Sequence, residues 1–261
     1  MPFVKPIAAL VLFASISSLT ATVSAQSVSS DQDVVHQARR AYYNLARLGF
    51  SGFQATIEPN WEVTLGYAAN PDNLTVFRDV RFSMNVDARG AVTLTHEVTG
   101  SQKTRVERYA KEIHNNVQRL VAGVFGTWAF FMIRSPFPES QIQILTLNKE
   151  YRLFYTEEST EVILTLTSDF LVAEAKLNGS TSRRTITPVF QKTSEGLLLT
   201  GYHTVSQPVG QGGKTTLYVK IEYEVVSGMK LPSKIHLKGM HGIEPIEAEL
   251  RFNQYVPNPQ R

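Results

Sequence analysis

The strongest constraint on the fold is a two-residue alternation of apolar and polar side chains near the C-terminal end of the chain. It is clearest over 217–225, where leucine, valine, isoleucine and tyrosine alternate with tyrosine, lysine and glutamate, and it recurs over 234–238 and 247–252. Successive side chains of a β-strand point to opposite faces of a sheet. Each stretch therefore predicts a strand of an antiparallel sheet that buries one face and exposes the other to water.

Further strands are expected where short apolar-rich stretches lie between turn-forming residues. Together with the alternating region, the stretches are 53–57, 61–67, 80–86, 91–98, 160–167, 170–177, 197–206, 214–226, 233–238 and 246–255. A sheet of so many strands tends to curl. Curling leaves an apolar concave face that another element has to cover.

Two helices are expected early in the chain. The first begins at Asp31 or Asp33 and ends before Gly49, and the second runs from about Lys103 to Phe125 or beyond, with apolar residues at helical spacing. We predict an α+β fold. It is a curved antiparallel sheet, an open half-barrel, with an N-terminal helix and a second amphipathic helix packed on or in its concave face.

The first residues are typical of a secretory signal peptide. Lys5 carries a positive charge, a short apolar stretch follows, and Val23-Ser24-Ala25 before Gln26 fits a cleavage site. The apolar stretch is too short to cross a bilayer, so an uncleaved membrane anchor is the weaker alternative. We expect cleavage after Ala25, which leaves 26–261 as a single periplasmic or secreted domain.

The chain contains no cysteine. An exported form therefore lacks disulfides and depends on an ordinary hydrophobic core, which favours a bacterial protein. The signal segment holds one lysine and no acid, so its removal lowers the formal net charge from +3 to +2. Because no run of lysine or arginine occurs, we expect no nucleic-acid partner.

Motif-like stretches fail to specify a catalytic or metal site. Gly212-Gly213-Lys214-Thr215 is similar to the end of a phosphate-binding loop, but Pro208 stands where the first glycine is required. Gly49-Phe50-Ser51-Gly52 matches a nucleophile elbow only superficially, and the six histidines lack metal-ligand spacing. We assign no catalytic residue, metal or cofactor. A hydrolase with a dispersed active site stays an alternative.

An uncharged run in the second helix is the most informative stretch. Arg119 and Arg134 bracket it, and its length of about fourteen residues is below the roughly twenty that a transmembrane helix needs. Two interpretations are open: a fully buried core helix, or a lid over an apolar cavity inside the curled sheet. Gly123 and Gly126 lower helix propensity, which suits either a lid that shifts or close packing on the sheet.

The lid interpretation selects candidate ligand-binding side chains from the helix and from one facing strand. They are Val117, Leu120, Val121, Val124, Phe125, Trp128, Leu217, Val219, Ile221 and Tyr223. Under this interpretation, aspartate at Phe125 or Trp128 weakens ligand binding and leaves the fold intact.

One local stretch carries a family resemblance. Tyr223-Glu224-Val225-Val226-Ser227-Gly228-Met229-Lys230-Leu231-Pro232-Ser233-Lys234-Ile235 places a glycine turn after a strand and Leu-Pro-Ser at the start of the next. With the order of the elements, it resembles the periplasmic lipoprotein-carrier superfamily, the Lol-type carriers and their mycobacterial lipid-carrier relatives. The resemblance implies an open β-half-barrel, closed by helices, that binds acyl chains reversibly without catalysis or cofactor.

Our leading hypothesis is an exported carrier or binding protein for a lipid, an acyl chain or a lipoprotein. Its expected partner is a lipid or lipidated protein, with transient contact to a membrane or membrane protein, and we expect a monomer. The alternative is a periplasmic protein-interaction or envelope-sensing module on the same fold, with its interior filled.

Overall fold

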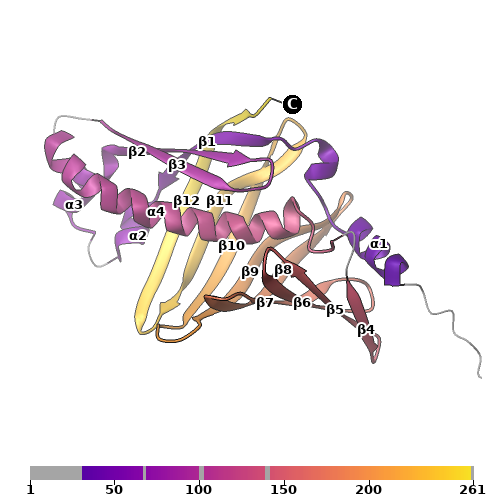
Figure 1. Ribbon diagram of the computed structural model, residues 1–261. Helices are drawn as coiled ribbons and strands as arrows, with labels where there is room; N and C mark the ends of the chain where they lie inside the picture. Colours follow the sequence, from indigo (N-terminus) through magenta and orange to yellow (C-terminus); the bar gives the residue numbers. More distant parts are fainter. Residues whose placement is uncertain (1–30, 67–68, 100–102, 139–141, 260–261) are drawn as a thin grey trace, which may run out of the picture.

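The computed structural model describes residues 31–66, 69–99, 103–138 and 142–259. The expected signal peptide lies outside the described residues. In the described part the chain forms an α+β fold in which one twelve-stranded antiparallel sheet, not closed into a barrel, curves around a long helix (Figure 1). This confirms the predicted fold class.

The helices of the described part are α1 (Asp31–Ala41), α2 (Trp61–Leu65), α3 (Pro71–Arg78) and α4 (Lys103–Met132), with a 3-10 turn η1 (Ala46–Leu48) after α1. The strands are β1 (Gly52–Pro59), β2 (Val80–Asp87), β3 (Val92–Val98), β4 (Gln143–Leu147), β5 (Glu150–Glu157), β6 (Thr160–Leu166), β7 (Val172–Asn178), β8 (Ser182–Thr193), β9 (Gly196–Pro208), β10 (Thr215–Val226), β11 (Met229–His241) and β12 (Glu244–Pro257).

The order of the strands explains why α4 lies inside the curve. The sheet runs β3-β2-β1-β12-β11-β10-β9-β8-β7-β6-β5-β4, so β3 and β4 are its two edges. The chain passes from β3 through α4 to β4, and α4 is therefore the connection between the two edges. Figure 1 shows it crossing the concave side of the curved sheet.

The second half of α4 fills the concave face. Phe125 and Trp128 are completely buried, and their rings meet edge to face with centroids 5.3 Å apart. Phe131 and Met132 are completely buried as well. The part of the concave face that these side chains contact is therefore packed core, which supports the core-helix interpretation over the lid.

The glycines of α4 do not serve close packing on the sheet. A Cβ atom added at Gly123 or Gly126 would meet nothing within 4 Å. Both positions therefore lie on open sides of the helix.

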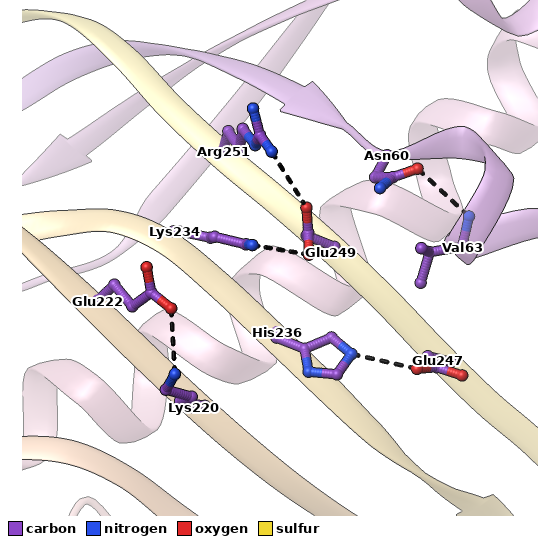
Figure 2. A network of polar contacts seen from close by, with 9 residues as sticks. All are labelled: Asn60, Val63, Lys220, Glu222, Lys234, His236, Glu247, Glu249 and Arg251. Carbon is purple, nitrogen blue, oxygen red and sulfur yellow. Dashed lines mark hydrogen bonds and ion pairs between the residues drawn. The ribbon is translucent and has the colours of Figure 1, made fainter.

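One predicted strand is a helix instead. Asn60 caps α2, because its side-chain oxygen accepts a hydrogen bond from the backbone N–H of Val63 at 3.3 Å (Figure 2). An asparagine before an apolar residue is a favourable helix start. The alternation of Trp61, Val63 and Leu65 fits a strand equally well, and the cap decides between the two structures.

The edge strand β3 is covered by α4. The Gln118 side chain accepts a hydrogen bond from the backbone N–H of Leu94 at 2.8 Å and donates one to the carbonyl of Val92 at 3.1 Å. Gln118 thus takes the place of a neighbouring strand on an edge that is otherwise open to further pairing. These bonds fix the position of the first half of α4 against the sheet.

Candidate functional site

The side chains predicted to bind ligand lie in three different places. Val117 and Leu120 line a cavity at one end of the concave side. Val121, Val124, Phe125 and Trp128 belong to the packed core, and the partly buried Leu217 packs against that core. Val219, Ile221 and Tyr223 border a groove between β9 and β10. The predicted set is therefore not one site.

The mouth cavity, as we name it, lies between α2, α4 and β12 and has a volume of about 410 Å³. Two aromatic rings stand in its wall, Trp61 of α2 and Phe77 of α3, with centroids 4.9 Å apart. Its other apolar walls include Leu65, Ile113, Val117, Leu120, Ile246, Ala248 and Leu250.

The lining of the mouth cavity contains few polar side chains. Glu112 and Asn116 of α4 are exposed, one helical turn apart. Thr64 is partly buried, and its hydroxyl oxygen has no hydrogen-bond partner among the described residues. An apolar interior with few polar groups suits the apolar part of an amphiphilic ligand.

A second space on the concave side, the inner cavity, lies between the last turns of α4 and strands β5–β8. Its volume is about 250 Å³. Its apolar floor consists of Phe130, Val162, Leu177 and Ile186, and its polar lining includes Thr127, Thr160, Arg134, Glu157 and Arg184. The open side of Gly126 contributes to this space.

The groove borders a split in the sheet. Strand β10 pairs with β9 only from Thr215 to Lys220, and beyond that point the two strands separate. The Tyr223 hydroxyl donates a hydrogen bond across the split to the carbonyl of Leu199. Burial raises the pKa of Tyr223 well above its usual value, and the indole of Trp128 lowers it in part. The groove itself has a volume of about 750 Å³.

The chain segment after α1 enters this split. The Tyr43 backbone N–H donates to the Leu197 carbonyl at 3.1 Å, and the Tyr43 hydroxyl accepts from the Lys230 N–H at 2.8 Å. Gly196 has φ +121°, and a Cβ there would lie 2.7 Å from the Tyr43 nitrogen. Glycine is therefore required where the two segments meet.

The outer face of β10–β12 carries paired charges. Lys234 lies 2.9 Å from Glu249, His236 3.2 Å from Glu247 and Lys220 3.2 Å from Glu222 (Figure 2). The hydrogen bond from Lys234 lowers the pKa of Glu249 below its usual range. These charged side chains alternate along the strands with buried apolar side chains, as predicted for a sheet with one face exposed to water.

Two general findings concern the described residues only. No group of three or more His, Cys, Asp or Glu side chains is placed there to hold a metal ion. None of the helices in those segments combines the length and the apolar character that crossing a membrane requires.

Sequence reasoning missed the aromatic wall of the mouth cavity and Arg184 of the inner cavity. Trp61 was missed because it lies in a stretch that was predicted to be a strand. The sequence signal that could have placed it on a helix is Asn60, which caps α2. Arg184 stands two residues before the buried Ile186, and this even spacing in a strand places both side chains on the concave face.

No protein-family model, curated protein or solved structure matches the chain.

Proposed function

We propose that the protein is an exported binding or carrier protein that holds the apolar chain of a lipid, an acyl chain or a lipidated protein, without catalysis. The observation that carries this proposal is the mouth cavity, an apolar space of about 410 Å³ between α2, α4 and β12. Its volume lies within the range of about 300–1,000 Å³ that is usual for small-molecule sites.

The size of the cavity favours reversible binding. Each methylene group moved from water into an apolar site contributes about 0.8 kcal/mol. Burial of about eight methylenes contributes about 6 kcal/mol, which corresponds to a dissociation constant of roughly 40 µM. The loss of ligand freedom weakens this further. Binding of this strength is readily reversible, which is compatible with release of a cargo.

The architecture also supports the proposal. The resemblance to the lipoprotein carriers implies an open half-barrel with helices over its concave side, and the open sheet around α4 agrees with that expectation. We include transport and lipoprotein sorting in the proposal on this ground alone.

Binding of a fluorescent fatty acid or fatty alcohol tests the proposal. We expect Leu120→Asp to weaken binding at least tenfold, because the charge lies in the apolar wall, and to keep the far-UV circular dichroism spectrum, because Leu120 is only partly buried. Leu145→Asp is the matched control, since Leu145 on the edge strand β4 is 47% exposed. Wild-type protein that binds neither probe would overturn the proposal.

A second candidate is a protein-interaction module. It is favoured by the packed core under α4 and by the groove on the outer face, where Val189 and Val225 are 55% and 69% exposed. A photo-crosslinking residue at Val225 should then form a discrete protein adduct in the native host, and one at the exposed Ile243 should not. Equal labelling from both positions contradicts this candidate.

A further inference from the structure

Arg184 points into the inner cavity from the middle of the sheet. In β8 it lies opposite Leu177 of β7 and Ser206 of β9. It shares the concave face with Ile186, which is 1% exposed. The side chain of Arg184 is itself partly buried, so its guanidinium group is only incompletely hydrated.

Within the described segments the side chain of Arg184 forms no hydrogen bond or ion pair, while its backbone pairs with β7 and β9. The charge of Arg184 acts on the hydroxyl group of Tyr202. Burial raises the pKa of the Tyr202 hydroxyl to about 12, while hydrogen bonding to Thr127 and the charge of Arg184 act to lower it. A partly buried arginine without a carboxylate partner is unusual, because burial of a charge is costly unless the charge is paired.

The other charged side chains that line the inner cavity, Arg134, Glu157 and Glu158, form no ion pair with Arg184. Just after the end of α4, Arg134 lies 3.3 Å from Glu157 of β5, and each of these two side chains is about one-third exposed. Glu158 follows in the exposed turn after β5. The lining that comes from β6 and β7 is uncharged: Thr160, Val162 and Leu177. Arg184 therefore faces an apolar floor and has no ion-pair partner among the residues that the structure describes.

We propose that the inner cavity binds the anionic group of an amphiphile, such as a carboxylate, at Arg184, with the adjoining methylenes against Phe130, Val162 and Leu177. The apolar part of this inference rests on the proposed function, whereas the anion site stands on Arg184 alone. The cavity of about 250 Å³ is smaller than most ligand sites. It therefore accommodates a head group and a few carbons, and the rest of the chain lies outside it.

Arginine suits this role because its planar guanidinium offers parallel N–H donors that match the two oxygens of a carboxylate. The partly buried position strengthens the attraction, since the effective dielectric constant there is lower than in water. Increasing salt should weaken binding only modestly, because a partly buried pair is screened less than an exposed one.

Arg183 provides a matched control. It is the neighbour of Arg184 in β8, is exposed and points to the outer face. Arg183→Gln and Arg184→Gln remove the same charge from the same strand, on opposite faces of the sheet. The experiment is calorimetric titration of wild type and both variants with dodecanoate, dodecanol and inorganic phosphate, each with circular dichroism as a check of folding.

We expect Arg184→Gln to weaken dodecanoate binding about tenfold, the effect of one lost charged hydrogen-bonding partner. Arg183→Gln should leave dodecanoate binding unchanged, and dodecanol should bind all three proteins equally. Dodecanoate affinities that are the same for both variants overturn the inference. If phosphate binds in an Arg184-dependent way and dodecanoate does not bind, the proposal that the ligand is an amphiphile is wrong, and the cavity is a site for free anions.

A second pair of variants tests the cavity without changing charge. Gly126 lines the inner cavity, while Gly123, on an exposed side of α4, does not. Gly126→Leu should fill the cavity and reduce dodecanoate binding, whereas Gly123→Leu should leave dodecanoate binding unchanged. Equal effects of the two substitutions would contradict binding in the inner cavity. Failure of the proposed function has a different signature: dodecanol then does not bind, while dodecanoate binding still depends on Arg184.

Discussion

The Nδ1 atom of His96 on β3 lies 3.1 Å from the Nδ1 atom of His114 on α4. The two rings have centroids 4.9 Å apart. One nitrogen can donate to the other while at least one ring is neutral, and protonation of both rings places two cations in contact. The contact between the edge strand and the first half of α4 is therefore sensitive to acid.

The pH dependence of stability has a definite sign. Burial, followed by the charge of His96, lowers the pKa of His114 below its ordinary value of 6.5. The unfolded chain therefore binds the proton more readily, and this contribution to stability, complete above pH 6.5, is lost as the pH falls below it. We expect the urea midpoint to fall between pH 7.5 and 5.5, and His114→Gln to reduce that fall. His36→Gln on α1 is the control, and a His114→Gln profile parallel to wild type contradicts the prediction.

The Gln118 bonds to β3 predict a stability effect at the sheet edge. Gln118→Ala removes both hydrogen bonds to Val92 and Leu94, and we expect a loss of about 1–2 kcal/mol in the free energy of unfolding. Amide hydrogen exchange at Leu94 should accelerate in the variant. Asn115→Ala, on an exposed position of the same helix, should change neither quantity. Unaltered exchange at Leu94 would show that Gln118 does not protect the edge.

Two glycines predict opposite responses to the same substitution. Gly123→Ala should stabilise the protein by up to about 1 kcal/mol, because it improves helix propensity and its Cβ meets nothing within 4 Å. Gly90→Ala should destabilise it, because φ is +83° and the new Cβ would lie 2.2 Å from the Cβ of Ala129. Thermal unfolding of both variants measures this, and a stabilising effect at Gly90 would be inconsistent with the packing of α4 on the β2–β3 turn.

The sheet could be predicted from the sequence because alternation is a local signal. Val219, Ile221, Ile235 and Leu250 are buried, as the two-residue period requires. The place of α4 followed from the need to cover an apolar concave face. These inferences depend only on neighbours in sequence and on the area that has to be buried.

The candidate site could be predicted only in part, because it depends on which distant segments meet. Val117 and Leu120 were identified, but Trp61 reaches the same cavity only through the fold of α2. The split between β9 and β10 depends on where Tyr43 enters the sheet, and a segment so far away in sequence leaves no periodic signal. The same limit explains why core and cavity residues of α4 were not distinguished.

Phe125 provides the test of this distinction, and here the structure corrects the expectation that aspartate leaves the fold intact. Phe125 and Trp128 are completely buried among the aromatic rings of the core, so a carboxylate at either position would lie unpaired in an apolar interior. We expect Phe125→Asp to prevent folding, and Phe125→Ala to lower the free energy of unfolding by about 3–5 kcal/mol. Urea denaturation of Phe125→Ala beside Leu120→Ala measures the difference, because Leu120 is only partly buried. Equal losses in the two variants would show that Phe125 lines an open cavity, as the lid interpretation requires.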